Sequence, residues 1–365
     1  MNELIQGFNN LNIQQGRNEV NYNSFKKLFW IKNVHSDDIH CLIKINDKKM
    51  ISGSKDTSIK LWTMNRNDDD LESGITLYRS ENNDYSSWIT ALCTSLDGKK
   101  CFAGSRNGEI FQINLNDLIP RKLDIFQNTQ EQSQHSYKCK KKNIDRINCL
   151  TTSNTGNLIY IGTATKFFIY DFEKSSLLSS TVVDSNDWVY CIYELNRNEI
   201  LLVIGARLEL WKIADNFECR KVSTIRSEAK NKNSKHQRNF ISSINPLINE
   251  KSLFSMAIFG GLVEVSNIET NEIVFSAHEH LKRVWVCENL LPFVFSSCAD
   301  DGFIKLWDLR IRRSIKTIKD HPHIESRVSV IKKLNDNIFI SGTCPDQIRN
   351  YADKAQFSFW DVRHL

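Results

Sequence analysis

Residues 278–310 read HEHLKRVWVCENLLPFVFSSCADDGFIKLWDLR. Apolar residues dominate two short runs, 283–287 and 293–297, and a third run ends in a Trp-Asp pair at Trp307. The second and third runs are separated by residues 299–302, whose Asp and Gly are typical of a tight turn between antiparallel strands. The stretch therefore predicts three short strands that fold back on one another.

The same pattern recurs along almost the whole chain. Residues 52–62 read SGSKDTSIKLW, and residues 357–363 read FSFWDVR. Other copies are less regular: Ile113 stands where the pattern has Trp, and residues 240–268 have no Trp at that position. We count seven units, and the repeat predicts one large all-β domain rather than two smaller domains.

The unit resembles a repeat of the WD-repeat (WD40) β-propeller family. The resemblance covers residues 25–365 and implies an all-β fold, a single seven-bladed propeller. In this family a His, a Ser or Thr, an Asp and a Trp form a buried hydrogen-bonded chain that holds the strands of a blade together. Carried over to this sequence, these residues are His35, Ser52, Asp56 and Trp62 in unit one, His278, Ser297, Asp301 and Trp307 in unit six, and His321, Ser341 and Trp360 in unit seven. We expect them to be structural rather than catalytic.

The last unit has too few residues for a fourth strand, because its third strand ends near Arg363. We predict that residues 25–32, FKKLFWIK, supply that strand and close the ring. Residues 1–24 are rich in Asn and Gln and lack a periodic pattern, so we expect them to be a flexible tail.

Three insertions lengthen the repeat, near residues 128–145, 227–239 and 345–355. By the resemblance, all three open on one face, the top face of the propeller. The first two are rich in Lys and Arg, whereas the whole chain has a net charge of only +5. A basic top face would attract an acidic or phosphorylated peptide, or an RNA backbone. The alternative is that these loops are merely solvated.

One position, just before the first strand of each unit, carries an unusual set of residues. A turn would favour Gly, Asn or Ser there, but the seven residues are Asp38, Trp88, Arg146, Trp188, Phe240, Arg283 and Arg327. In the family this position lies at the top rim of the central channel. Trp, Tyr and Arg dominate binding energy at interfaces, so we predict that this rim, with Tyr190 and Trp285 beside it, binds a partner. The alternative is that the aromatic rings pack between blades and the arginines pair with aspartates.

Four residues of unit six, Asp301, Trp307, Asp308 and Arg310, resemble the box by which WD-repeat substrate receptors dock on the adaptor of cullin 4 ubiquitin ligases. Only Arg310 is additional to the structural pattern. The alternative is that Arg310 pairs with Asp308 or with a neighbouring blade.

Several classes of function find no support in the sequence. There is no Gly-x-Ser-x-Gly, no phosphate-binding Gly-rich loop and no His-Glu-x-x-His, so we expect no enzyme. The ten cysteines form no Cys-x-x-Cys, so we expect no metal and no other cofactor. No run is long and apolar enough to span a membrane, and no signal peptide is recognisable. We expect an intracellular protein, cytoplasmic or nuclear, with free thiols.

The sequence thus predicts a non-enzymatic scaffold or subunit of a larger complex that binds an acidic or phosphorylated peptide on its top face. The alternatives are a substrate receptor of a cullin 4 ligase and an RNA-associated subunit. The expected partners are one or more proteins, with neither a membrane nor a small-molecule substrate.

Overall fold

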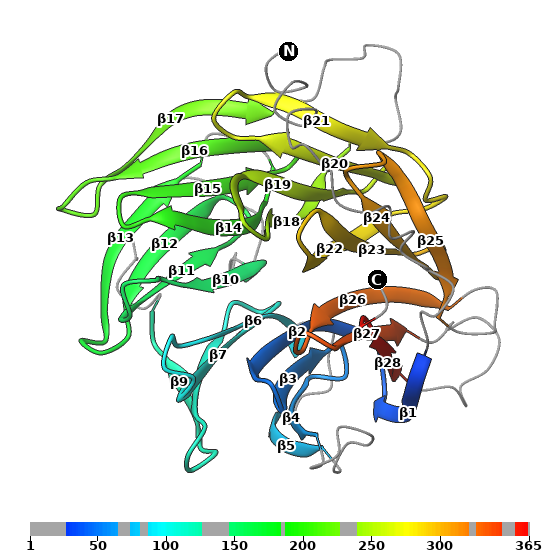
Figure 1. Cartoon of the computed structure of the whole chain (residues 1–365). Coiled ribbons are helices and arrows are strands. Elements are labelled where there is room, and N and C mark those ends of the chain that lie inside the picture. The colour runs from blue at the N-terminus through cyan, green and yellow to red at the C-terminus, as the bar shows by residue number, and fades with distance from the viewer. Residues whose placement is uncertain are drawn as a thin grey trace, which may run out of the picture.

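The computed structural model describes residues 27–64, 74–80, 87–125, 146–183, 187–226, 239–320, 326–344 and 355–363. Within these ranges the chain forms seven four-stranded antiparallel sheets and no α-helix. The sheets stand around a common axis as the blades of a ring (Figure 1). The predicted fold, an all-β seven-bladed propeller, is therefore confirmed.

The first three blades follow the chain in order from the inner strand to the outer strand. Blade 1 contains β2 (Ile39–Asn46), β3 (Lys49–Ser54), β4 (Ser58–Thr63) and β5 (Ile75–Arg79); blade 2 contains β6 (Ile89–Thr94), β7 (Lys100–Ser105), β8 (Ile110–Asn114) and β9 (Pro120–Leu123); blade 3 contains β10 (Cys149–Thr152), β11 (Leu158–Gly162), β12 (Lys166–Asp171) and β13 (Ser176–Val182).

The next three blades have the same order. Blade 4 contains β14 (Val189–Asn196), β15 (Glu199–Ile204), β16 (Arg207–Ile213) and β17 (Cys219–Arg226); blade 5 contains β18 (Ile241–Leu247), β19 (Glu250–Ile258), β20 (Leu262–Asn267) and β21 (Glu272–Ala277); blade 6 contains β22 (Val284–Leu291), β23 (Val294–Ala299), β24 (Phe303–Asp308) and β25 (Arg313–Lys319).

Blade 7 joins the two ends of the chain. Its order is β26 (Arg327–Lys333), β27 (Ile338–Cys344), β28 (Ala355–Asp361) and then β1 (Lys27–His35), so the N-terminal strand is the outermost one. The strands β1 and β28 are antiparallel, and the rings of Phe29 and Phe359 stack with their centroids 4.2 Å apart. The prediction that an N-terminal strand closes the ring is confirmed, although β1 continues to His35, beyond the predicted limit of residue 32.

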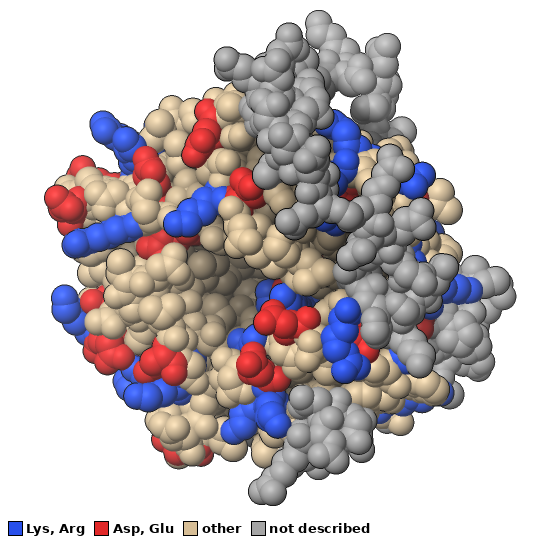
Figure 2. All heavy atoms as spheres, in the orientation of Figure 1, with Lys and Arg blue, Asp and Glu red and all other residues tan. Residues whose placement is uncertain are grey.

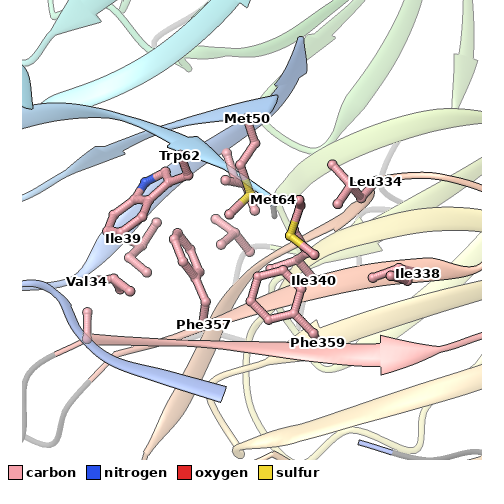
Figure 3. Close-up of a cluster of buried hydrophobic side chains, with 13 residues drawn as sticks. Val34, Ile39, Met50, Trp62, Met64, Leu334, Ile338, Ile340, Phe357 and Phe359 are labelled. Carbon is pink, nitrogen blue, oxygen red and sulfur yellow. The ribbon is translucent and has the colours of Figure 1, made fainter. Parts of the chain in front are cut away.

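A buried cluster fills the space between blades 7 and 1, next to this seam (Figure 3). Phe357 of β28 is fully buried, and its ring meets the edge of Trp62 of β4 at a centroid distance of 5.4 Å. Val34 of β1 and Ile39 of β2 lie beside them (Figure 3). Truncating a buried Phe to Ala costs about 3–5 kcal/mol, so the contact between the last blade and the first is a major contribution to stability.

Small residues in the second strands allow neighbouring blades to approach closely. A Cβ atom on Gly53 would lie 2.5 Å from Cγ2 of Ile89, the first residue of the next inner strand. Gly162 is crowded in the same way by Val189 of blade 4, with its Cγ1 only 2.9 Å away. Such distances are too short for real contacts, so glycine is required where the β-branched residue of the next blade packs.

Side-chain hydroxyl groups also connect neighbouring inner strands. Thr90 donates a hydrogen bond to the carbonyl oxygen of Ile147 at 2.6 Å, and Ser242 donates one to the carbonyl of Val284 at 2.8 Å. Ser329 of blade 7 donates to the carbonyl of Ile39 of blade 1 at 2.6 Å, across the seam. These bonds fix the positions of neighbouring inner strands, which line the central channel of the ring.

The predicted hydrogen-bonded chain of blade 1 is present. Trp62 Nε1 donates to Ser52 Oγ at 2.8 Å, Ser52 Oγ lies 2.7 Å from His35 Nε2, and His35 Nδ1 lies 2.9 Å from Asp56 Oδ2. An ionised carboxylate can only accept, so Nδ1 of the imidazole carries the proton and Nε2 accepts from the Ser52 hydroxyl. Every member is thereby satisfied while buried.

The chain of blade 6 requires a correction, because its histidine is His280 and not His278. His280 Nε2 lies 2.7 Å from Ser297 Oγ, and its Nδ1 lies 2.9 Å from Asp301 Oδ2. Trp307 Nε1 completes the chain with a bond of 2.8 Å to Ser297. His278 instead places its Nε2 2.7 Å from the carbonyl oxygen of Gly260, in the preceding blade. Only the His280 ring lies close enough to β23 and the turn after it for its two nitrogens to reach Ser297 and Asp301.

Blade 7 has a different polar group at this site. Trp360 Nε1 donates to Ser341 Oγ at 2.8 Å, as predicted, but the Ser341 hydroxyl then donates to Asp320. Lys27 of β1 in turn donates to that carboxylate, with its Nζ 3.0 Å from Asp320 Oδ1. His321, which was predicted for this blade, lies outside the described residues.

We predict that the two histidines of blade 6 differ sharply in their contribution to stability. The change His280→Ala leaves Ser297 and Asp301 buried without their partner, so the free energy of unfolding should fall by about 2–4 kcal/mol. The matched change His278→Ala removes only one bond at an exposed site and should cost less than about 1 kcal/mol. Urea denaturation of both variants measures the difference, and equal losses would contradict the assignment.

We also predict that mild acid destabilises the fold. Burial lowers the pKa of His35 below its ordinary value, although Asp56 opposes the shift. The unfolded chain then binds more protons than the folded chain as the pH falls through about 6.5, so the free energy of unfolding decreases. The carboxylate of Asp56, whose pKa is lowered, protonates only in stronger acid. Denaturation at pH 7.5 and pH 5.5 checks this, with NMR of the His35 imidazole as the direct readout; equal stability at both values would refute it.

Candidate functional site: the top rim

The top rim is built from backbone positions that the blades repeat. We call the face where the first strand of each blade begins the top face. In blade 2, Arg106 N donates to the carbonyl of Trp88 at 2.8 Å, and in blade 5, Phe259 N donates to the carbonyl of Phe240 at 2.9 Å. The same bond joins Lys55 to Asp38, Gly205 to Trp188, and Asp300 to Arg283. In these five blades the residue that follows the second strand is thereby placed next to the predicted rim residue.

Aromatic rings of blades 4 to 6 form a continuous line, which we call the aromatic arc. Its members are Trp188, Tyr190, Phe240, Phe259 and Trp285, with consecutive ring centroids 6.1, 5.8, 6.0 and 5.6 Å apart. Trp188 is 40 % exposed, and the other members are partly exposed. Such tilted and edge contacts fix each ring while leaving part of its surface accessible.

Guanidinium groups stack on both ends of the aromatic arc. At one end, Arg146 Cζ lies 5.2 Å from the ring centre of Trp188. At the other end, Arg283 Cζ lies 5.0 Å from the ring centre of Trp285 and 4.3 Å from that of Phe259. Neither arginine has a carboxylate within ion-pair distance in the described part of the chain. The expectation that the rim arginines pair with aspartates therefore does not hold for these two.

Arg327 differs, because its guanidinium donates to Asp38 Oδ2 at 3.0 Å. Asp38 is buried, and 289 residues separate the two partners in the chain. This ion pair joins blade 7 to blade 1 at the top face. Both residues were predicted to bind a partner, and the structure gives them a connecting role at the seam.

Three basic side chains, from blades 1 and 2, surround the ring of Trp88, which does not belong to the aromatic arc. Arg106 Cζ lies 4.7 Å and Lys55 Nζ 4.8 Å from its ring centre, and the His40 ring lies 5.6 Å away. Lys55 also reaches Asp37 at 3.5 Å. Burial lowers the pKa of His40 to about 4, with Arg146 and Lys55 adding to the effect, so its imidazole is neutral at pH 7.

Comparisons with known proteins agree with this architecture. The family model described as "WD domain, G-beta repeat" matches residues 27–63, and the solved WD40 β-propeller domain of Doa1 superposes with a TM-score of 0.67 at 15 % identity, covering 93 % of this chain and 98 % of that one. This chain is a seven-bladed β-propeller with a WD repeat at residues 27–63. At so low an identity the likeness to the Doa1 domain concerns the fold alone.

Two curated relatives of this WD-repeat chain come from Arabidopsis thaliana. Protein SPA1-RELATED 4 is 37 % identical over 76 residues, which is 20 % of this chain and 10 % of that protein. Protein SPA1-RELATED 3 is 33 % identical over 76 residues, which is 20 % of this chain and 9 % of that protein. The WD-repeat chain thus matches about a tenth of the length of each relative.

The sequence pattern of the WD repeat did not reveal Lys55, Arg106, Phe259 and Asp300 as rim residues. Each follows the end of a second strand, directly after SGS in the case of Lys55 and AGS in the case of Arg106. A comparison of these positions across the seven units would have found them. The backbone bond that brings them beside the first set of rim residues joins different strands, so the pattern of a single strand does not reveal it.

The predicted adaptor box lies at the end of β24. Asp301 and Trp307 belong to the hydrogen-bonded chain, and Arg310 forms a fork on Asp308 with Nε to Oδ1 at 2.9 Å and an Nη2 to Oδ2 at 2.6 Å. Arg363 and Asp361 repeat this fork in blade 7. The recurrence favours the structural interpretation, although the Arg310 side chain is still 47 % exposed.

Charges of both signs are intermixed on the face that Figure 2 shows, around a hollowed centre. The predicted basic insertions and the insertion at 345–355 lie almost entirely outside the described residues. Within the described ranges no three His, Cys, Asp or Glu side chains gather as a metal site would require, and no helix is long and apolar enough to cross a membrane.

Proposed function

We propose that this protein is a non-enzymatic interaction platform whose top rim binds an extended, acidic or phosphorylated segment of a partner protein. The observation that carries the proposal is the aromatic arc with Arg146 and Arg283 stacked on it. WD40 propellers generally serve as interaction domains, and this rim has the side chains that an interface needs.

The chemistry of the arc suits the binding of a peptide chain. Rigid aromatic side chains offer a large contact area and lose little conformational entropy when they bind. The arc is held by ring contacts and by the backbone bond between Phe259 and Phe240, so it is already formed before a partner arrives. Preorganisation of this kind lowers the entropic cost of association.

The charges of the rim favour an acidic partner. Arg146 and Arg283 have no carboxylate partner in the described ranges, whereas Arg327 and Lys55 do. An anionic group on the partner would form charge-assisted hydrogen bonds with the two arginines, which are roughly twice as strong as neutral ones. The partner would therefore combine apolar residues for the arc with negative charge beside it.

The two alternative functions receive no specific support from the described residues. The guanidinium of Arg310 binds Asp308 within the same blade, so the ligase-receptor hypothesis still depends on the sequence resemblance alone. The hypothesis of RNA binding depends on basic insertions that lie outside the described ranges.

We predict that the aromatic arc is required for binding, and a displayed library of random peptides, including acidic and phosphorylated ones, provides the test. Truncating an aromatic anchor of an interface typically costs about 2 kcal/mol or more of binding free energy. Trp285→Ala should therefore lower the affinity for the selected peptides roughly 30-fold. Fluorescence anisotropy with full-length protein measures the affinity.

The matched control is Trp30→Ala, since Trp30 is 57 % exposed on β1, the outermost strand of blade 7, away from the rim. This variant should bind as the unchanged protein does. Melting temperatures of both variants show that the ring is intact. If no peptide is selected, or if both variants bind normally, the rim is not the binding surface.

A further inference from the structure

Three buried polar nitrogen atoms on the inner side of blades 1 and 3 have no hydrogen-bond partner within the described ranges. They are His40 Nε2, Arg146 Nε and Asn148 Nδ2. Buried polar groups in folded proteins are nearly always bonded. Single buried atoms without a partner also occur elsewhere in the described blades, at Ser266 and Asn289, but these three nitrogens flank the inner strand of blade 2 together. Their grouping points to a ligand that completes them.

Two cationic groups lie at the same place. The guanidinium groups of Arg106 and Arg146 come from neighbouring blades, and neither has a carboxylate within ion-pair distance among the described residues. Burial lowers the pKa of Arg146, and the like charge of Arg106 lowers it further. The fold therefore brings two positive charges together in a partly buried setting, and no described carboxylate pairs with either of them.

The indole rings determine how these guanidinium groups can be used. Arg106 is stacked on Trp88 and Arg146 on Trp188, with Cζ atoms 4.7 and 5.2 Å from the ring centres. A guanidinium that stacks by its face keeps its N–H groups at its edge, directed within its own plane. Two such edges, together with the amide of Asn148, present donors and no acceptor of matching charge.

We propose that Arg106, Arg146 and Asn148 form a seat for a phosphoryl group carried by the bound partner segment. We call it the phosphoryl seat. It rests on the proposed function and adds one specific chemical requirement to it. A phosphate ester has three acceptor oxygens and close to two negative charges at pH 7, which matches two guanidinium edges and an amide. A carboxylate would occupy only one of the two edges.

His40 lies beside the phosphoryl seat but adds no positive charge to it at pH 7. Its low pKa keeps the imidazole neutral at pH 7, so it offers hydrogen bonding beside the seat without a third charge. The nearby acids are engaged elsewhere, Asp37 with Lys55 and Asp38 with Arg327. They therefore do not compete strongly for the two arginines.

The test uses N-acetyl-phosphoserine amide as the probe, with N-acetyl-glutamate amide and inorganic phosphate as comparisons at constant ionic strength. Isothermal titration with the full chain should show saturable binding of the phosphoserine compound and at least tenfold weaker binding of the glutamate compound. Arg106→Gln and Arg146→Gln should each lower the affinity for the phosphoserine compound tenfold or more. Since the second pKa of a phosphate ester is about 6, binding should also weaken below that pH.

Two control variants make the result specific. Arg310→Gln removes a guanidinium that is forked on Asp308, and Arg363→Gln removes one that is forked on Asp361, both away from the rim. Both should leave the affinity for the phosphoserine compound unchanged. Equal losses in these controls, equal affinity for the glutamate compound, or no saturable binding would each overturn the phosphoryl seat.

The outcome is separable from that of the proposed function. If selected peptides depend on Trp285 but not on Arg106 or Arg146, the platform stands and the phosphoryl seat is refuted. If the phosphoserine compound binds through the two arginines while no peptide depends on Trp285, the seat stands and the aromatic platform is refuted. Melting temperatures of all variants confirm that the ring is folded in each experiment.

Discussion

The pairing of β1 with β28 is the constraint on which the rest of the structure depends. A ring of separate sheets keeps only short, protected strand edges when its last blade is complete, and here the outermost strand of that blade comes from the other end of the chain. Three further contacts reinforce this seam: the buried cluster around Phe357, the bond from Ser329 to the carbonyl of Ile39, and the ion pair of Arg327 with Asp38. Closure sets the distances across the channel, and therefore the positions of all rim side chains.

Polar networks within the blades solve one problem in several ways. Blades 1 and 6 connect Trp, Ser, His and Asp, whereas blade 7 connects Trp360 and Ser341 to Asp320 and then to Lys27 of β1. Blade 4 bonds Trp211 directly to the buried carboxylate of Glu209, which Lys221 also contacts at 2.7 Å. In each case a buried donor finds an acceptor. The physical requirement is that each buried polar group has a hydrogen-bond partner, and the residue types can vary as long as every group has one.

The top rim contains a group of exceptions to this rule. Within the described blades most buried polar side chains are bonded, yet His40, Arg146 and Asn148 each keep an atom without a partner, and Arg146 and Arg106 lie close enough to repel each other. Stability alone would not favour this arrangement. It is consistent with a surface prepared for an anionic ligand beside an aromatic arc that is already in place.

The sequence by itself determined the number of blades and the strand that closes the ring, and it predicted the first set of rim residues, because the alternation of apolar residues and the small or polar turn residues between strands are local signals that repeat. It pointed to His278, which is wrong, because two histidines so close together fit the same pattern and only the loop geometry shows that the His280 ring reaches Ser297 and Asp301. Likewise, only the tertiary structure paired Arg327 with Asp38 and left Arg146 without a carboxylate among the described residues. Those relations join residues of different blades, and the distances between blades follow from closure of the whole ring rather than from any single repeat.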